Sequence, residues 1–257
     1  MFVAIIQARM GSTRLPGKVM KKILDKPLIE YLLQRVSTSK YIDKIIVATT
    51  SNTEDDTLSQ YVLDLGYDVF RGSVDDVLGR YYDAYLTLGK MKDSVQGIIR
   101  ITGDCPLFEA DICDKLIEGY RENDLDFMNI DKTFAEGLDC SIFSKELLVE
   151  AFNNAKLQSE REHVTLYFHN HKDKFHMDTL INSEDDSKYR ITVDEDNDLE
   201  VVKNIIEYCT DNQIKPNIQN IKQYLDENQE VFFLNSTITR NEGLLKSLKD
   251  ESIRRNG

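Results

Sequence analysis

The chain has 257 residues, enough for a large hydrophobic core in one or two α/β domains. Its net charge of −13 argues against broad binding of nucleic acid or of an anionic membrane. No apolar stretch approaches the roughly 20 residues that span a bilayer, and the N-terminus does not read as a signal peptide. The 4 cysteines have no C-x-x-C spacing, which predicts reduced thiols and a cytoplasmic location.

Predicted strands and helices alternate through the first hundred residues. In chain order they are a strand at 2–8, a Gly/Pro-bearing loop at 9–18, a helix at 27–37, a strand at 44–50, a helix at 54–65, a strand at 68–71, a helix at 75–88 and a strand at 96–102. This order predicts an α/β fold with a mostly parallel sheet and helices on both faces. Ligands of such sheets bind at the carboxyl ends of the strands, which places the 9–18 loop and the Gly103-Asp104 turn at one edge.

The second half is less regular. The pattern predicts helices at 109–123, 144–154 and 159–170, a strand at 188–193, a helix at 197–210, and two more helices at 218–228 and 242–254 around an apolar, strand-like VFFL at 231–234. No linker rich in Pro, Gly or Ser interrupts the chain. We therefore expect one domain over residues 1–212 and a helical tail over 213–257 that packs on it or on a dimer partner.

The loop after the first strand carries the clearest functional signal. Gly11 and Gly17 let the backbone approach a ligand, and backbone N–H groups in such a turn bind phosphate oxygens. Arg9, Arg14 and Lys18 add charged donors suited to a triphosphate. The loop is not a Walker A motif, because five residues separate its glycines and a valine follows the lysine. The alternative is a basic surface turn without a ligand.

Several blocks of sequence resemble one known family. IIQARMGSTRLPGKV resembles the opening signature of the cytidylyltransferases of the spore coat polysaccharide biosynthesis protein F type, which are related to CMP-sialic acid (acylneuraminate) and CMP-Kdo synthetases. The resemblance continues in VATT, VFRGSVDDVLGRYYDA, IIRITGDCPL, EGLDCSIFS, SEREHVT and RITVDEDNDLE. It implies a nucleotide-diphospho-sugar transferase fold, a three-layer α/β/α sandwich with a mixed sheet. It also implies transfer of CMP from CTP to a sugar, sugar-acid or phospho-sugar acceptor, with Mg²⁺ and release of pyrophosphate, in surface polysaccharide biosynthesis.

The resemblance also assigns residues. Arg9, Lys18 and Asp104 are expected to take part in catalysis. Asp104 and Asp194 are expected to bind Mg²⁺. The residues expected to bind the nucleotide are Ala8, Arg9, Gly11, Ser12, Arg14, Lys18, Thr49 and Asp104. On its own, Asp104 also suits a turn in which its carboxylate accepts backbone N–H groups. Cys105 is better explained as a packed cysteine than as a nucleophile.

The acidic run that begins at Asp194 resembles an EF-hand only superficially. Leu199 stands where that loop needs glycine, and Ile205 where it needs glutamate. Asp196 and Asp198 are better explained as partners of a helix N-terminus. The family commonly has threonine directly after the aspartate, where this chain has Glu195.

The acceptor is expected near four residues, Asp139, Arg161, Glu162 and His163. The order E-R-E-H at 160–163 excludes a zinc-protease helix, and a surface salt-bridge network is the alternative for Arg161, Glu162 and His163. Ser141 stands where the family has a glutamate, so the choice of acceptor can differ here. By analogy with relatives we expect a homodimer, with segment 140–180 and the tail as candidate contacts. The rival functions are a glycosyltransferase of the same fold that uses a nucleotide-sugar and a non-catalytic nucleotide-sugar-binding protein.

Overall fold

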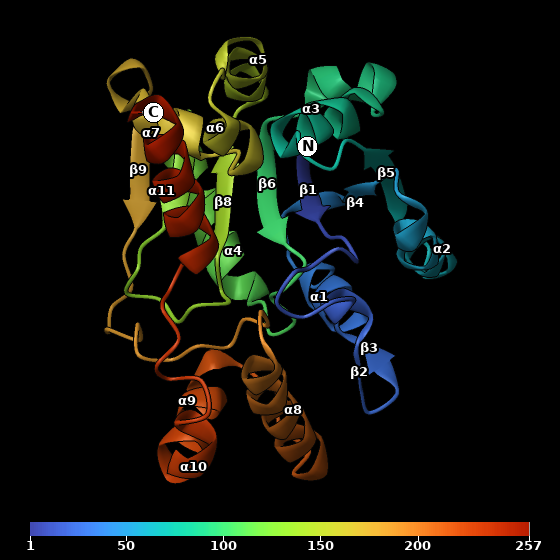
Figure 1. Ribbon diagram of the computed structural model, residues 1–257, viewed down its shortest axis with the longest axis vertical. Helices are drawn as coiled ribbons and strands as arrows, with labels where there is room; N and C mark the ends of the chain where they lie inside the picture. The colour runs from blue at the N-terminus through green and yellow to red at the C-terminus, as the bar shows by residue number, and fades with distance from the viewer. Residues whose placement is uncertain (257) are drawn as a thin grey trace.

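The computed structural model describes the backbone of residues 1–256 and the side chains of residues 1–249, 251 and 252. A seven-stranded sheet with the order β5-β4-β1-β6-β8-β7-β9 runs through its centre (Figure 1). The strands are β1 (Phe2–Gln7), β4 (Ile42–Thr50), β5 (Asp68–Gly72), β6 (Gly97–Thr102), β7 (Phe127–Ile130), β8 (Cys140–Phe143) and β9 (Met177–Leu180). Only β8 in this sheet runs antiparallel to its neighbours. The predicted α/β class with a mixed, mostly parallel sheet is therefore confirmed.

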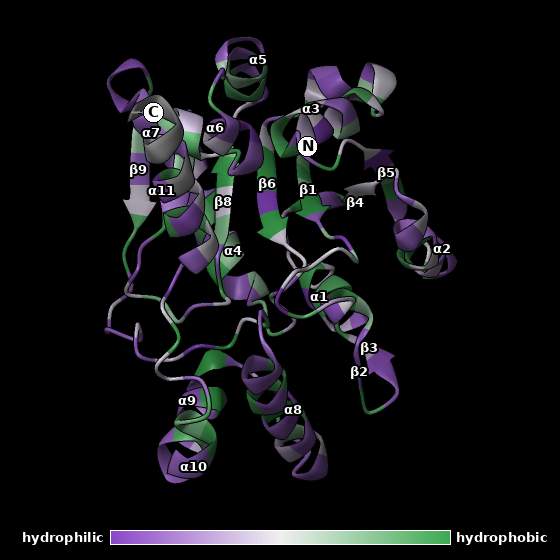
Figure 2. Ribbon diagram, in the orientation of Figure 1, coloured by the Kyte–Doolittle hydropathy of each residue, from purple (hydrophilic) through white to green (hydrophobic). Residues whose placement is uncertain are grey.

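Alternate residues of β1 enter two separate cores, because successive side chains of a strand point to opposite faces of a sheet. Phe2, Ala4 and Ile6 join a core with α1 (Leu28–Val36), α2 (Asp56–Asp64), α4 (Ala110–Glu122) and α8 (Asp196–Asp211). Val3 and Ile5 join a second core with α3 (Val77–Leu86), α5 (Lys145–Asn154) and α7 (Leu166–Asn170). Figure 2 shows this as a hydrophobic centre with more hydrophilic helices around it. The expected three-layer arrangement is confirmed.

Short elements connect the layers. They are η1 (Lys18–Met20), the hairpin strands β2 (Lys22–Ile23) and β3 (Lys26–Pro27), η2 (Thr53–Asp55), η3 (Gly89–Ser94), α6 (Gln158–Glu162) and η4 (Lys172–Lys174). None of the helices in the described part of the chain is both long and apolar enough to cross a membrane.

The tail contains α9 (Ile218–Glu227), α10 (Gln229–Phe232) and α11 (Glu242–Asn256). Helix α9 contributes Ile221, Tyr224 and Leu225 to the first core. The chain then passes the ends of the strands, and α11 lies against α6 on the other side, in front of the sheet between β8 and β9 in the view of Figure 1. The tail thus contacts both helical layers.

The predicted strand at 188–193 was wrong. This segment is extended, but only Arg190 forms a β-bridge, to Glu136. Its backbone groups pair with loops instead: Ile191 N donates to Glu136 O at 2.7 Å, and Val193 N to Asp104 O at 2.8 Å.

Two further assignments needed correction. The strand-like 231–234 begins inside α10, where Val231 is buried and Phe233 is 63% exposed. A strand in a sheet core would bury both. The single helix expected at 159–170 is divided into α6 and α7 around Val164, whose φ of 37° lies outside the helical region.

Candidate active site

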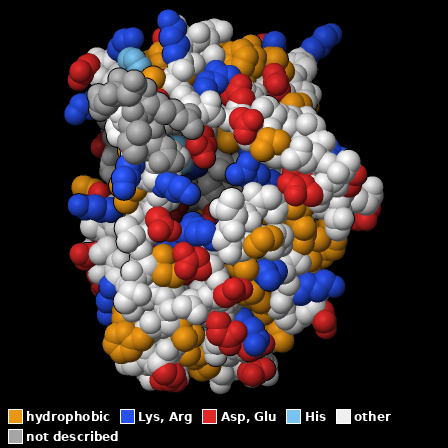
Figure 3. Space-filling view, in the orientation of Figure 1, with side chains coloured by type: hydrophobic (Ala, Val, Ile, Leu, Met, Phe, Trp, Pro, Cys, Tyr) orange, Lys and Arg blue, Asp and Glu red, His pale blue; other side chains and the backbone are white. Residues whose placement is uncertain are grey.

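A cavity of about 400 Å³ opens where β1 and β6 end. Figure 3 shows Lys and Arg side chains around a hollow in the middle of this face of the molecule. The residues that line the cavity are Gln7, Ala8, Arg9, Gly11, Ser12, Thr13, Arg14, Lys18, Val19, Val77, Arg80, Thr102, Gly103, Asp104, Glu162, His163, Glu242, Gly243 and Lys246. The two carboxyl-end segments singled out by the sequence therefore meet in one cavity.

The 9–18 loop is held by its own backbone and by two buried side chains. Met10 O accepts hydrogen bonds from Ser12 N at 2.8 Å and from Gly17 N at 2.9 Å. Gly17 has a φ of 68°, a conformation that favours glycine. Leu15 and Val19 are buried in the core, and their anchoring turns Arg9, Arg14 and Lys18 toward the cavity.

Lys18 lies between two aspartates that are distant in sequence. Its Nζ is 3.0 Å from Asp104 Oδ2 and 2.8 Å from Asp194 Oδ1. Burial alone would lower the pKa of Lys18, but the two carboxylates outweigh burial and raise it. Burial would likewise raise the pKa of Asp104, but Lys18 and a hydrogen bond from Thr102 lower it to about 2. Lys18 and Asp104 are therefore both charged at neutral pH.

Backbone contacts fix the positions of the two aspartates. Val193 N donates to Asp104 O at 2.8 Å, and Thr192 Oγ1 donates to the same oxygen at 3.2 Å. Gly103 is pressed against the first strand, because a Cβ there would lie 2.7 Å from Ala8 Cβ. The separation of the carboxylates thus depends on the main chain as well as on their own rotamers.

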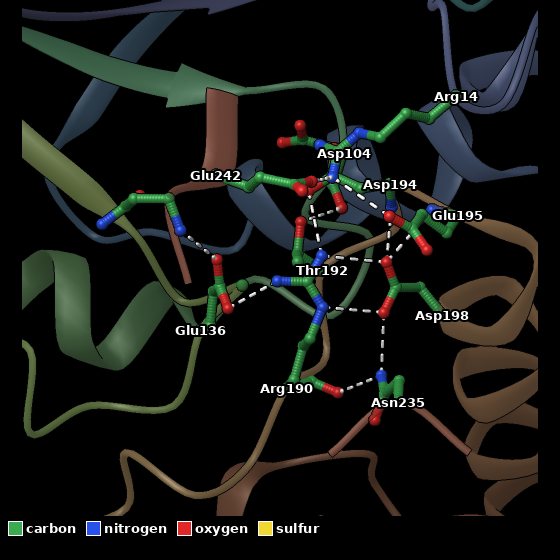
Figure 4. Close-up of polar contacts among 12 residues, drawn as sticks. Arg14, Asp104, Glu136, Arg190, Thr192, Asp194, Glu195, Asp198, Asn235 and Glu242 are labelled. Atoms are coloured by element: carbon green, nitrogen blue, oxygen red, sulfur yellow. Dashed lines mark hydrogen bonds and ion pairs between the residues drawn. The ribbon is translucent and has the colours of Figure 1, made fainter. Parts of the chain in front are cut away.

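Arg190 supports Asp194 from beneath (Figure 4). Its guanidinium contacts Glu136 at 2.6 Å, Asp198 at 2.8 Å and Asp194 at 3.1 Å. Asp198 also accepts the backbone N–H groups of Asp194 and Glu195, as expected for a residue that caps a helix N-terminus. The Arg190 side chain is 5% exposed and that of Asp198 is fully buried, so this network forms a rigid floor under the site.

The second cation of the loop, Arg14, is shared among three acids. It lies 3.2 Å from Asp194, 3.3 Å from Glu195 and 2.7 Å from Glu242 at the start of α11. The tail therefore reaches directly into the cavity. No pattern in the sequence indicates the contact with Glu242, because it joins residues 228 positions apart.

The structure adds Arg80 and Gln7 to the cavity wall. Arg80 is 3% exposed, and within the described residues no carboxylate lies within 4 Å of it; its Nη1 donates to Ser73 O at 3.1 Å. Burial and the nearby Arg9 lower its pKa. Gln7 Oε1 is buried without a hydrogen-bond partner in the described part of the chain. A polar residue at the end of an apolar strand and an arginine on an apolar helix face were the available signals.

Thr49 does not reach this cavity. It is fully buried within β4, its Oγ1 has no partner among the described residues, and it is absent from the cavity lining. The other residues expected to bind the nucleotide, from Ala8 to Asp104, all line the cavity.

A second cavity of about 320 Å³ lies beside the first, and His163 lines both. Asp139 also lines it, and Glu162 lines the first cavity. Arg161 lines neither: its Nη1 donates to Phe152 O at 2.9 Å, and its Nη2 pairs with Asp76. Three of the four residues expected near the acceptor thus face a cavity, and Arg161 faces away.

The architecture matches that of nucleotide-diphospho-sugar transferases. The structure aligns with a CMP:2-keto-3-deoxy-manno-octonic acid synthetase complexed with CTP at a TM-score of 0.59 and 16% identity, covering 80% of this chain and 98% of that chain. It also aligns with a cytidylyltransferase from Leptospira borgpetersenii serovar Hardjo-bovis at a TM-score of 0.83 and 33% identity, covering 93% and 99%.

Sequence comparisons agree. The chain is 34% identical to the spore coat polysaccharide biosynthesis protein SpsF of Bacillus subtilis over 206 residues, which are 77% of this chain and 83% of the relative. The model of the family described as cytidylyltransferase matches residues 3–247. The chain belongs to the cytidylyltransferase family.

Proposed function

We propose that this protein transfers CMP from CTP to a sugar, sugar-acid or phospho-sugar acceptor in surface glycan biosynthesis, with release of pyrophosphate. The observation that carries the proposal is the position of Lys18, within hydrogen-bond distance of Asp104 and Asp194 on the wall of a cavity that Arg9, Arg14 and Arg80 also line. A triphosphate needs such a concentration of cations, whereas a diphospho-sugar needs less. The relative solved with CTP supports the choice of nucleotide.

The chemistry would be an in-line displacement. An acceptor oxygen forms a bond to the α-phosphorus, the bond from that phosphorus to the bridging oxygen breaks, and pyrophosphate leaves. Arg9 and Arg14 would hold the β- and γ-phosphates, and Ser12 would donate to a phosphate oxygen. Catalysis of this kind comes from positioning and from charge neutralisation, without a protein nucleophile.

Asp104 and Asp194 are the residues that would hold Mg²⁺. Both carboxylates contact one ammonium, so they converge on a single cation-sized position, and carboxylate oxygens suit this ion. No cluster of three His, Cys, Asp or Glu side chains with metal-site geometry occurs within the described residues, and Mg²⁺ typically needs only one or two carboxylates beside phosphate and water. The bound ion would neutralise negative charge on the phosphates.

Three further features belong to the proposal. Cys105, Cys113, Cys140 and Cys209 are free and buried, which fits a cytoplasmic location.

Residues 1–212 would form the nucleotidyltransferase domain, and 213–257 an appendage that completes its cavity. The homodimer expected by analogy belongs to the proposal as well, and light scattering after size exclusion tests it directly.

The function is tested in two steps. A thermal-shift screen with Mg²⁺ should give the largest stabilisation with CTP among nucleoside triphosphates and nucleotide-sugars; a preference for UDP-sugars would favour a glycosyltransferase. Pyrophosphate release with CTP and a panel of acceptors should then depend on Asp104, so Asp104→Asn should lower turnover by at least about a hundredfold while the fold persists. Full activity of this variant would remove Asp104 from the catalytic site.

A further inference from the structure

We propose that the second cavity binds the acceptor, and that Arg100 on its floor holds an anionic group of that acceptor, a carboxylate or a phosphate. This inference rests on the proposed cytidylyltransferase activity and adds the class of acceptor and the residue that selects it. The cavity volume of about 320 Å³ is in the range of small-molecule sites. Because His163 lines both cavities, a molecule in the second cavity lies next to one in the first.

The floor of this cavity is a row of polar residues across the sheet. Arg100 in β6 is paired in register with Ser141 in β8, and Ser141 with Asn129 in β7. Ile98 and Phe143, two residues away along their strands, belong to the second core. Since alternate residues share a face, the polar row lies on the α3 and α7 side of the sheet. Figure 2 shows the corresponding hydrophilic stretch in β6.

Three polar atoms around the cavity are buried and have no hydrogen-bond partner in the part of the chain that the structure describes: Arg100 Nε, Ser141 Oγ and His163 Nε2. Ser141 as a whole is 6% exposed. His163 Nε2 lies 4.0 Å from Glu162 Oε2, too far for a hydrogen bond. Buried polar groups nearly always have partners, so three exceptions at one cavity indicate a polar ligand.

The charge of the lining selects an anion. Arg100, Lys132 and Arg240 are the cations of this lining, and Asp139 is its only acidic residue among those that the structure describes; Asp139 is already paired with Arg240 at 3.1 Å. Within the described residues, no carboxylate lies within 4 Å of Arg100 or Lys132. An excess of positive charge in a chain of net charge −13 is a local feature that suits a negatively charged ligand.

Arg100 is better placed for this task than Arg161. Arg161 is held by Asp76 and Phe152 and lies outside both cavities. Arg100 lies beside His163, whose pKa is lowered by burial and also by the charge of Arg100. An arginine in this position presents a planar fork that matches a carboxylate or a phosphate, and Ser141 and Asn129 suit the hydroxyl groups of a sugar.

The first experiment measures pyrophosphate release with CTP, Mg²⁺ and matched acceptors: eight- and nine-carbon 2-keto sugar acids, hexose 1- and 6-phosphates, and the neutral sugars without these groups. We expect turnover only with charged acceptors, and the active subset distinguishes a carboxylate from a phosphate. Efficient turnover of a neutral sugar would overturn the inference, as would bound CTP with no turnover of any charged acceptor. Failure to bind CTP would instead count against the proposed function.

The second experiment compares variants on the active acceptor. Arg100→Gln should raise the KM for the acceptor by at least about tenfold while the Kd for CTP changes less than about twofold, and Arg100→Lys should recover part of the loss. Arg121→Gln, on the exposed face of α4, is the matched control. An unchanged acceptor KM in Arg100→Gln would overturn the assignment, and a raised KM in Arg161→Gln instead would restore the anchor expected from sequence. CTP affinity reports whether each variant is folded.

Discussion

Arg14 and Glu242 lie at opposite ends of the chain, yet their side chains meet at 2.7 Å at the mouth of the first cavity. Glu242 therefore forms an ion pair with the guanidinium that, in the proposed function, binds phosphates. The acid belongs to α11, which also lines the cavity through Gly243 and Lys246. Binding of a triphosphate has to compete with this contact.

Replacing Glu242 by glutamine should therefore strengthen CTP binding. The pair is solvent-exposed, and such pairs contribute about 1 kcal/mol or less, so the Kd should fall by about two- to fivefold in calorimetric titrations. Glu230→Gln, on the exposed surface of α10, should leave the Kd unchanged. Weaker CTP binding by Glu242→Gln would show that the acid supports the loop rather than competing with the nucleotide.

Arg80 should separate binding from stability. A buried arginine that forms no ion pair with a carboxylate among the described residues is costly to the fold, so Arg80→Met should keep or raise the melting temperature. It should also weaken CTP binding by about tenfold, because a charge-assisted donor to the ligand is lost. Calorimetry and thermal denaturation on the same preparation measure both effects. A lower melting temperature with normal CTP affinity would make Arg80 structural.

Replacing Arg190, in contrast to Arg80, should lower the stability of the fold. Arg190→Met leaves Glu136 and Asp198 buried without their shared cation, which should lower the free energy of unfolding by about 3–5 kcal/mol in urea titrations. Lys188→Met, two residues away and exposed, should cost less than about 1 kcal/mol. Similar losses for both variants would contradict the view of Arg190 as the support of Asp194.

His163 should make stability depend on pH. Burial lowers its pKa from the ordinary 6.5, with Glu162 opposing and Arg100 adding to the shift. Below pH 6.5 the unfolded chain binds a proton that the folded chain resists, so the free energy of unfolding falls as the pH falls. The slope from this group is at most about 1.4 kcal/mol per pH unit.

Urea titrations between about pH 8 and pH 5 measure this dependence. His163→Gln should flatten the fall below pH 6.5 relative to the native chain, whereas His176→Gln, at an exposed position, should leave it unchanged. An equally steep fall in His163→Gln would assign the dependence to other groups.

The parts of the fold that were predictable are those with strong local patterns. The strand at 2–8 is apolar on both faces, the strand at 96–102 is mostly apolar, and α1 and α4 have the regular apolar periodicity of helices with one buried face. Strands β7, β8 and β9 were missed because each has only four residues and β9 is only partly buried. Segment 188–193 has the composition of a strand, but its backbone partners are loops, which sequence does not reveal.

The same limit applies to the site. Lys18 and Asp104 follow predicted strands, so their meeting could be anticipated from topology, whereas Asp194 was assigned from the family resemblance and the strand predicted before it does not form. Arg100 was recognisable as a charged residue inside a mostly apolar strand, but its proposed role depends on which strand lies beside β6 on the side away from β1. That neighbour is β8, a strand the sequence pattern did not predict.

The reversed direction of β8 has an evolutionary consequence. Parallel strands bring their last residues to the ligand edge, but β8 brings its first, so Asp139 reaches it from the connection that precedes the strand and Ser141 from the start of the strand itself. The connection at 131–139 thus serves both halves of the site, because Lys132 and Asp139 line the second cavity while Glu136 contacts Arg190 beneath Asp194. A change in this connection would therefore alter the second cavity and the support of Asp194 together, so sequence variation at one cavity is constrained by the other.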